Sequence, residues 1–496
     1  MKERAMNFWD ERAPGAAPDA RADRSAATSD LAASVCIIGA GLTGLWTAYY
    51  LAKADPSLAI VVLEKETVGF GASGRNGGWC SALFPRSAAS LERTHEFDAA
   101  VAMRSAMVAT VAEVGRVTAL EGIDCDFAQG GTLTFAMSPV QVAAAHAEVE
   151  EADRFGVDRL TYTSFVGGGL HNSASSATAA APTTGTAGHP AGALGATHDP
   201  ACARLHPGKL VHGLAAVVQR LGVRIHEHTE VVSWVPGHVT FRAASAATSS
   251  TGAGTGTGTV AADRIVIATE AYGAKLPGVG RRILPLYSLM IATEPLPDTF
   301  WESAGIAHGN TFSDYRHLLI YGQRTADNRF AFGGRGARYH WGSSIRPSYD
   351  TVERVFDHLR DTLVDLFPDA FDAEVTHRWG GPIGVPRDWH ASASFNPRTG
   401  IAYAGGYVGD GLSTTNLAGR TLTALMTGND PSLAAPGADL RTLPWVNHLS
   451  PRWEPEPLRF LGTNLGLASA DLADREERMT GRPSRTALLL GPLTGH

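Results

Sequence analysis

The sequence predicts an α/β fold in which a Rossmann-like domain is interleaved with a second domain built on an antiparallel β-sheet. Three observations lead to this prediction. A strand, a glycine turn and a helix follow one another near the start of the chain, the same series returns near its end, and strand-like segments dominate between them. The chain has 496 residues, of which 44% are hydrophobic, so it can bury the cores of more than one domain.

The first unit is a β-α-β pattern. An apolar run at residues 35–38 predicts a strand, the apolar spacing over 42–53 predicts a helix, and an apolar run at 60–63 predicts a second strand that ends at Glu64. Residues 1–33, before this unit, are rich in Ala, Asp and Arg. We interpret them as a polar N-terminal leader.

A glycine motif, G-x-G-x-x-G, stands between the first strand and the helix. Gly39 makes a tight turn, Gly41 lets a pyrophosphate approach N–H groups at the helix N-terminus, and Gly44 allows the helix to pack closely on the strand. Glu64 lies about 20 residues further on, where a carboxylate binds a ribose 2′-hydroxyl. This context predicts dinucleotide binding; a glycine turn without a ligand is the alternative. The candidate contacts in the motif are Gly39, Gly41, Leu42, Thr43 and Gly44.

A second glycine-dense segment, residues 69–78, follows the β-α-β unit. It holds too many glycines for the interior of a regular helix or strand, and such a loop lets the backbone approach a ligand closely. The candidate contacts in this loop are Gly71, Ala72, Ser73, Arg75, Asn76, Gly77 and Gly78.

The remaining patterns predict two discontinuous domains. Helix and strand patterns of the Rossmann-like domain occupy residues 34–120, 205–280 and 395–430. The second domain occupies residues 121–170 and 281–394, where strand-like segments dominate. The chain therefore crosses between the domains more than once.

Three further segments lie outside these domains. Residues 173–197 and 243–262 are mixtures of Ala, Ser, Thr and Gly, which bury too little apolar surface to offset the entropy of ordering. We expect both to be low-complexity surface insertions. Residues 440–496 form a C-terminal tail that we expect to pack on the core, with a membrane surface or a partner subunit as alternatives.

Composition argues against several classes of function. The formal net charge is −7 and there is no dense Lys/Arg block, which disfavours a nucleic-acid partner. The 18 histidines show no HExxH spacing, and the cysteines form no CxxC pair, so we expect no metal site and no disulfide framework. No segment offers about 18 uninterrupted apolar residues or a secretory signal, which predicts a cytoplasmic protein. The four cysteines are Cys36, Cys80, Cys125 and Cys202.

The N-terminal motifs together resemble a known superfamily. The glycine motif at residues 39–44, the Leu-Glu-Lys at 63–65 and the loop at 71–78 resemble the D-amino-acid oxidase and glycine oxidase (DAO) superfamily of flavoenzymes. Within it, the Ser-Gly-Arg-Asn-Gly-Gly string at 73–78 and the helix at 43–50 look most like the γ-glutamylputrescine oxidase branch.

The C-terminal glycine turn extends the resemblance. Residues 403–412 and 417–420 resemble the second flavin segment of that superfamily, so the likeness covers about residues 30–430 apart from the two insertions. It implies a glutathione-reductase-like FAD-binding domain and an antiparallel substrate domain. A helix N-terminus near the flavin would also stabilise the negative charge of the reduced ring.

The resemblance implies a role for further residues. Glu64 and Lys65 would meet the adenosine ribose, and Val231 the adenine. The loop at 71–78 would line the pyrophosphate and the isoalloxazine. The other expected FAD contacts are Thr269, Gly406, Gly409, Gly411 and Leu412.

We predict that FAD is bound non-covalently. Some relatives link their flavin through a histidine or a cysteine. Asn76 stands near the position of that histidine, and the turn at residues 381–384 contains no cysteine. Cys80 lies close to the loop, but a lone cysteine in an apolar stretch is more often a packing residue.

The resemblance implies oxidation of the C–N bond of a small amine or amino acid. Hydride passes to the flavin N5, the imine hydrolyses, and O2 reoxidises the flavin to give H2O2. A dehydrogenase that uses another acceptor and a non-catalytic FAD-binding scaffold are the alternatives. The sequence does not identify the amine or the oligomeric state.

Substrate contacts are expected from the second domain. Arg324, in a segment that resembles the carboxylate site of amino-acid-oxidising relatives, is suited to a bidentate pair with a carboxylate. A solvated hairpin arginine beside Asp327 is the alternative. The other candidates for the pocket wall, each of which is otherwise a core or rim side chain, are Tyr287, Tyr315, His317 and Trp379.

Overall fold

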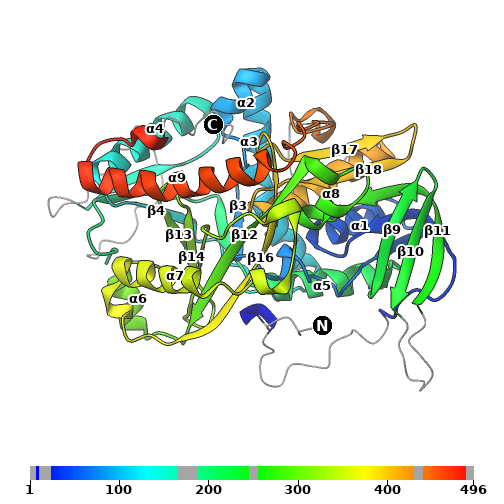
Figure 1. The fold of residues 1–496 in the computed structure, drawn as a ribbon, viewed down its shortest axis with the longest axis horizontal. Coiled ribbons are helices and arrows are strands. Elements are labelled where there is room, and N and C mark those ends of the chain that lie inside the picture. The colour runs from blue at the N-terminus through cyan, green and yellow to red at the C-terminus, as the bar shows by residue number, and fades with distance from the viewer. Residues whose placement is uncertain (1–6, 11–23, 166–187, 245–254, 429–438, 488–496) are drawn as a thin grey trace.

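The computed structural model describes residues 7–10, 24–165, 188–244, 255–428 and 439–487. Their strands form two large sheets that lie side by side, with helices packed around both (Figure 1). The first sheet belongs to the Rossmann-like domain and the second is mostly antiparallel. The predicted fold class is confirmed by this architecture.

The first sheet is built around β1 (Leu31–Ile38), which pairs in parallel with β2 (Ile60–Leu63) and β11 (Thr255–Ile267). β8 (Arg224–His226) extends it beyond β2, and β18 (Ile401–Gly405) beyond β11, both in parallel. The buried stretches of these strands are rich in Val, Ile and Leu, as expected for a parallel sheet with both faces covered.

Three further strands of this sheet run antiparallel to their neighbours. β17 (Ser392–Asn396) closes one edge beside β18. β9 (Thr229–Val235) and β10 (His238–Ala244) form a hairpin that pairs with β11. This hairpin is the wing at the right of Figure 1.

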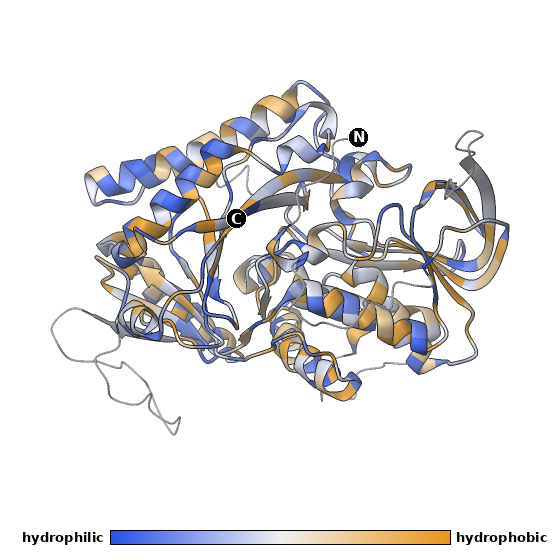
Figure 2. Ribbon diagram, turned by 90° about the horizontal axis from the view of Figure 1, so that it is seen from below, coloured by the Kyte–Doolittle hydropathy of each residue, from blue (hydrophilic) through white to orange (hydrophobic). Residues whose placement is uncertain are grey.

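Helices pack around the first sheet. α1 (Leu42–Ala54) and α8 (Gly411–Thr427) pack against each other; a Cβ on Gly419 would lie 2.7 Å from the backbone of Trp46, so glycine permits this close approach. α5 (Pro207–Arg220) also contacts α1, and α2 (Ala88–Thr94) and α3 (Phe97–Glu121) complete the layer. Hydrophobic and hydrophilic residues alternate along the outer helices, which is typical of helices with one face on a core (Figure 2).

The second sheet contains eight strands, all antiparallel to their neighbours except the parallel pair β13 and β4. In spatial order they are β16 (Val375–Pro386), β12 (Ile283–Thr293), β15 (Phe330–Gly334), β14 (Ile320–Arg324), β13 (Thr311–Asp314), β4 (Thr132–Ala136), β6 (Gly195–Asp199) and β5 (Thr161–Ser164). Buried aromatic side chains join α6 (Asp298–Ala304) and α7 (Glu353–Leu366) to one face of this sheet. α4 (Pro139–Phe155) contacts β4, β5 and β6, and a small sheet of β3 (Trp79–Ser81) and β7 (Cys202–Arg204) stands apart.

The predicted insertions are wrong over part of their length. Residues 195–197 belong to β6, and residues 255–262 belong to β11. Both stretches are poor in large apolar residues, but their backbones pair with neighbouring strands, which side-chain composition does not reveal. Residues 195–197 pair with β4 and β5, residues 255–261 pair with β10, and residues 260–262 pair with β1. Residues 173–187 and 245–254 of the predicted insertions lie outside the described residues.

Two boundaries also need correction. The leader is not uniformly polar, because Phe8 and Trp9 in a short turn are buried and β1 already begins at Leu31. Residues 392–394, assigned to the second domain, start β17 of the first sheet. The tail contains α9 (Leu458–Thr480), whose buried residues are Arg459 and Ala473.

Candidate functional site

The first glycine turn lies at the carboxyl end of β1, where α1 begins. Gly39 has a φ of +107°, and a Cβ on it would lie 2.6 Å from the carbonyl oxygen of Ala268. A Cβ on Gly44 would lie 2.1 Å from the carbonyl oxygen of Gly39, so α1 packs directly on the turn. The turn therefore places the N-terminus of a 13-residue helix at the sheet edge, where its N–H groups and dipole favour an anionic ligand.

Glu64 follows β2 and its carboxyl group lies beside this turn. Oε2 accepts a hydrogen bond from the backbone N of Ala40 at 2.8 Å, and Oε1 accepts one from the N of Glu66 at 2.9 Å. Burial raises the pKa of the Glu64 carboxyl, an effect that these two N–H groups oppose. The carboxyl is thus held where the motif predicts the ribose contact.

The second glycine-dense loop packs against the start of α1. Ser73 Oγ accepts a hydrogen bond from the N of Leu42 at 2.8 Å. The side chain of Asn76 organises the loop, because its Nδ2 donates to the carbonyl of Ala72 at 3.0 Å and its Oδ1 accepts from the N of Gly78 at 2.8 Å. The loop and the helix start therefore form one continuous surface.

The opposite side of this loop contacts the second sheet. The indole N–H of Trp379 in β16 donates to the carbonyl of Arg75 at 2.9 Å, and Nε2 of Gln323 in β14 donates to the carbonyl of Gly77 at 2.6 Å. A Cβ on Gly77 would lie 2.6 Å from the ring of Tyr321, so glycine permits this approach. The loop lies between the two domains.

The second glycine turn, between β18 and α8, lies beside the first. The hydroxyl groups of Tyr407 and Thr43 are 3.0 Å apart. The N–H groups of Gly406 and Tyr407 donate to Oε1 of Glu270 at 3.2 and 3.0 Å. Burial raises the pKa of the Glu270 carboxyl to about 7, although the surrounding N–H groups oppose this rise. The N–H of Gly406, a predicted flavin contact, is therefore engaged by a carboxyl group.

Two charged groups stand where α8 begins. Nη2 of Arg335, just after β15, donates to the carbonyl of Val408 at 2.9 Å, and its guanidinium lies 5.2 Å from the ring of Trp389. Burial raises the pKa of the Asp410 carboxyl to about 6, and Arg335 opposes the rise. Both side chains keep partial accessibility although protein surrounds them. Tyr321, whose hydroxyl is 2.8 Å from Ser288 Oγ, interacts electrostatically with Arg335.

The residues around the two turns fit a dinucleotide. Thr269 lies next to the first turn, with its Cα 3.8 Å from the position of a Cβ on Gly39. Its hydroxyl is buried and has no hydrogen-bond partner in the described part of the chain. An unsatisfied buried hydroxyl costs free energy, so a ligand that bonds it would be stabilised.

Comparison with known proteins decides the family. The profile of the DAO family, described as FAD dependent oxidoreductase, matches residues 34–425. This chain belongs to the DAO family. Its relatives include γ-glutamylputrescine oxidoreductase of Escherichia coli K12, 30% identical over 405 residues that cover 80% of this chain and 84% of that protein. The probable oxidoreductase OrdL of Haemophilus influenzae Rd is 28% identical over 421 residues, covering 81% and 84%. The family predicted from the sequence is confirmed.

Solved structures show the same DAO fold. Glycine oxidase from Geobacillus kaustophilus superposes with a TM-score of 0.61 at 19% identity, covering 85% of this chain and 100% of that one. L-amino acid deaminase from Proteus myxofaciens superposes with a TM-score of 0.60 at 15% identity, covering 87% and 96%. At these identities the likeness supports the fold alone.

The predicted adenosine contacts lie near Glu64. Nζ of Lys65 forms an ion pair with Oε1 of Glu230 at 2.8 Å, in β9. Val231, the next residue of β9, is 6% exposed and packs into the core between the sheet and the β9–β10 wing. Among the other predicted contacts, Gly71 precedes and Ala72 begins a short turn, Gly409 has a φ of +110°, and Gly411 and Leu412 begin α8.

Arg324 is the main correction to the predicted site. Its Nη2 is 2.9 Å from Oδ1 of Asp298 and its guanidinium stacks 5.0 Å above the ring of Trp301, on the face of the sheet that α6 covers. Tyr321 and Gln323 point to the opposite face, toward the glycine loop, because successive side chains of a strand alternate. The structure therefore does not bring Arg324 to the site.

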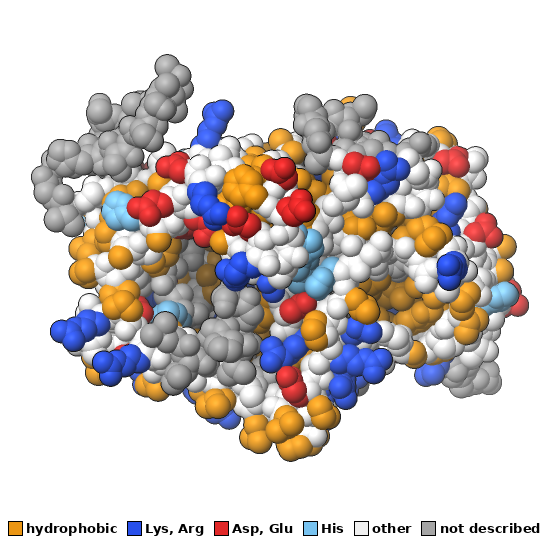
Figure 3. Space-filling model, turned by 90° about the horizontal axis from the view of Figure 1, so that it is seen from above, with side chains coloured by type: hydrophobic (Ala, Val, Ile, Leu, Met, Phe, Trp, Pro, Cys, Tyr) orange, Lys and Arg blue, Asp and Glu red, His pale blue; other side chains and the backbone are white. Residues whose placement is uncertain are grey.

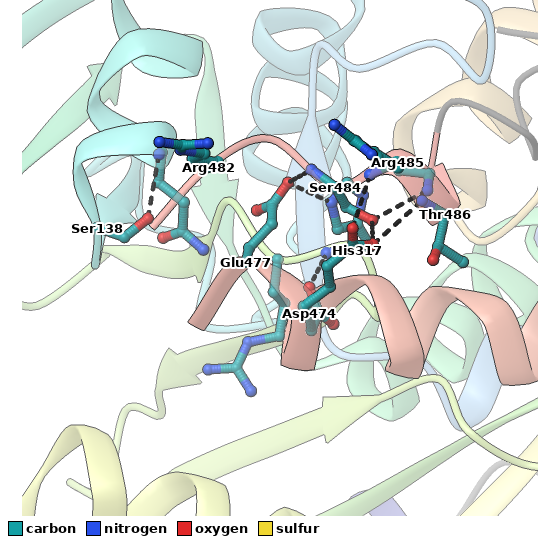
Figure 4. Close-up of polar contacts among 12 residues, drawn as sticks. Ser138, His317, Asp474, Glu477, Arg482, Ser484, Arg485 and Thr486 are labelled. Atoms are coloured by element: carbon teal, nitrogen blue, oxygen red, sulfur yellow. Dashed lines mark hydrogen bonds and ion pairs between the residues drawn. The ribbon is translucent and has the colours of Figure 1, made fainter. Parts of the chain in front are cut away.

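Two further candidates also lie elsewhere. The N of His317 donates to Oδ1 of Asp474 at 2.7 Å and its ring is 3.1 Å from Oε1 of Glu477, so it contacts α9 (Figure 4). The hydroxyl of Tyr315 is 2.8 Å from Oγ1 of Thr197 and also donates to Glu148. These contacts place both residues beside α9, α4 and β6, not at the glycine loop.

The last two aromatic candidates, Tyr287 and Trp379, differ in what they contact. Tyr287 is 2% exposed, and its ring packs edge-on against His340 and Tyr349. Trp379 contacts the glycine loop through its hydrogen bond to Arg75. Among the five predicted substrate contacts, Trp379 is the one that this hydrogen bond joins to the loop.

Other observations concern metals, thiols and surfaces. All four cysteines are free and buried, and burial raises the pKa of the Cys80 thiol well above its ordinary range.

The described residues contain no group of three His, Cys, Asp or Glu arranged around a metal, and none of the described helices has the length and apolar character for crossing a bilayer. Acidic and basic side chains are interspersed on the described surface seen in Figure 3.

Sequence reasoning missed several groups at the site: Tyr321, Ser288, Arg335, Asp410 and Glu270. Arg335 follows two glycines at the end of β15, and Asp410 stands inside the second glycine turn, so their positions beside flexible backbone were visible in the sequence. Glu270 has a φ of +44°, an unusual conformation for a non-glycine residue, and no sequence pattern predicts that conformation.

Proposed function

We propose that this member of the DAO family oxidises the C–N bond of a small amine or amino acid and binds FAD non-covalently between its two glycine turns. The observation that carries the proposal is the convergence of the turn at Gly39, the loop that ends at Gly78 and the start of α8 on one region between the sheets. Amines and amino acids are also what the names of the relatives specify.

The chain offers distinct groups to each part of FAD. The N-terminus of α1 and the backbone near Ser73 would bind the pyrophosphate, and the Glu64 carboxyl would bind the adenosine ribose. The backbone N–H groups at the start of α8 would face the flavin edge that becomes negative on reduction. Two observations support non-covalent binding: the Asn76 amide is bonded within the loop, and burial raises the pKa of the Cys80 thiol.

Bound FAD would supply the two-electron acceptor for the hydride of the substrate. The protein groups would orient the substrate and exclude water. Arg335 would receive an anionic end of the substrate. One of its five side-chain N–H groups donates to the carbonyl of Val408, which leaves other donors for the substrate. Tyr321 and Ser288 form the adjoining polar wall. Asp410, with a pKa of about 6, would accept a proton from an ammonium group near neutral pH.

The test is an anaerobic reduction followed by exposure to air. A panel of amines and amino acids is mixed with the yellow protein, the absorbance near 450 nm is followed, and hydrogen peroxide is then measured. Bleaching with stoichiometric peroxide supports an oxidase that uses O2. Bleaching without reoxidation by air points to a dehydrogenase with another acceptor, and failure of every amine to bleach the flavin contradicts the proposed function.

A further inference from the structure

We propose that Trp9, in the N-terminal turn at residues 7–10, is a positioning residue that holds the flavin-binding loop. The inference rests on the proposed role of the loop at residues 71–78. It assigns a task to a segment that sequence composition marks only as a polar leader.

Two indole groups hold consecutive carbonyls of the loop. Nε1 of Trp9 donates to the carbonyl of Asn76 at 2.8 Å, and Nε1 of Trp379 donates to the carbonyl of Arg75 at 2.9 Å. One indole comes from the N-terminus and the other from β16 of the second sheet. A loop rich in glycine has little conformational preference of its own, so such external bonds fix its shape.

The turn that carries Trp9 is itself ordered by short-range bonds. Oδ1 of Asn7 accepts a hydrogen bond from the N of Trp9 at 2.8 Å, and Nδ2 of Asn7 donates to Oδ2 of Asp10 at 2.7 Å. The N of Asp10 donates to the carbonyl of Asn7 at 3.0 Å. These bonds fix the direction of the indole before it meets the loop.

Packing fixes the turn on the second domain and on α5. The ring of Trp9 meets the rings of His206 and Trp379 edge-on, at 4.8 and 6.1 Å between centroids. Phe8 packs against His377 and Trp379. Phe8 is 6% exposed and Trp9 is 4% exposed. A Cβ on Gly208 in α5 would lie 2.4 Å from the carbonyl of Trp9. The indole N–H is therefore largely shielded from water and depends on the loop carbonyl.

The experiment separates loop positioning from general packing. The full-length variants Trp9→Phe, which removes the N–H and keeps a ring, and Phe8→Leu, which alters the packing and keeps the N–H, are compared with the unchanged protein. Tyr49→Phe is the matched control, because it removes one hydroxyl bond, to Glu121, at a distance from the loop. The measured quantities are the FAD dissociation constant of the apoprotein, the visible circular dichroism of the bound flavin and the melting temperature of the apoprotein.

Trp9→Phe is expected to weaken FAD binding about fivefold, the loss typical of one hydrogen bond, and to change the visible dichroism. Phe8→Leu and Tyr49→Phe are expected to lower the melting temperature of the apoprotein and to leave the dissociation constant within about twofold. Equal dissociation constants for Trp9→Phe and the unchanged protein, or equal weakening by Phe8→Leu, would overturn the inference. If the unchanged protein fails to bind added FAD, the proposed function fails instead.

Discussion

The hydroxyl groups of Thr43 and Tyr407 lie 3.0 Å apart, although 364 positions of the chain separate them. Thr43 stands in the first turn of α1, and Tyr407 in the glycine turn before α8. The pair joins the two strand–turn–helix units directly, and both residues are buried. This contact brings together the two distant segments that the sequence predicts to form one site.

This pair gives a first prediction. Tyr407→Phe and Thr43→Val each remove one hydroxyl, and each is expected to destabilise the protein by about 1 kcal/mol because a buried partner is left unsatisfied. The double variant is expected to cost less than the sum of the two. A double-mutant cycle based on urea denaturation measures the coupling, and additive effects would show that the two hydroxyls do not interact.

Substitution of Gly41 tests the turn at the helix N-terminus. A Cβ at Gly41 would lie 2.9 Å from Oγ of Ser73, and a valine would cover the N–H groups that a pyrophosphate approaches. Gly41→Val is expected to give a folded protein without flavin, as measured by the ratio of absorbance at 450 and 280 nm. Gly462→Ala is the control, because a Cβ there meets nothing within 4 Å. A Gly41→Val protein with full flavin content contradicts the placement.

The two arginines give opposite expectations. Arg335→Leu is expected to raise the KM for acidic substrates about tenfold or more, because a charge-assisted pair is lost. Arg324→Ala is expected to leave that KM unchanged and to destabilise the protein by about 2 kcal/mol, since Arg324 bonds to Asp298 and Asn328. Steady-state kinetics and thermal unfolding separate these effects. The reverse pattern would restore Arg324 as the carboxylate ligand.

Glu270 gives a pH dependence of defined sign. Its pKa of about 7 in the folded protein lies above its ordinary value of 4.5, so the folded state binds more protons than the unfolded state between these limits. The stabilising contribution is therefore complete below about pH 4.5 and is lost as the pH rises toward 7, at up to about 1.4 kcal/mol per pH unit. Glu270→Gln is expected to remove this slope. The denaturation midpoints of the unchanged protein and of Glu270→Gln are measured from pH 5 to pH 8. Parallel curves for the two proteins would contradict the raised pKa of Glu270.

The sequence predicted the parts of this fold that follow a period or a motif. The strand that ends just before Gly39, the helix that begins at Leu42 and the strand before Glu64 are set by apolar spacing and by glycine, which act locally. The same holds for the second turn before α8. These are also the parts on which the family resemblance rested.

The sequence could not predict features that depend on register and on distant contacts. Arg324 and Gln323 are both polar, so alternation along β14 did not reveal which of them faces the loop. The strand that includes residues 255–262 is held by backbone pairing with β1 and β10, which its small side chains do not signal. Trp9 reaches Asn76 across 67 positions of the chain, and no local pattern encodes that contact.

The visible spectrum of the purified protein, before and after acid precipitation, tests the central claim most directly. We predict a yellow protein with a flavin band near 450 nm, and we predict that the colour passes into the supernatant as free FAD. Colour that stays in the pellet would contradict non-covalent binding. A colourless protein that also takes up no added FAD would contradict the claim that the two glycine turns form a flavin site.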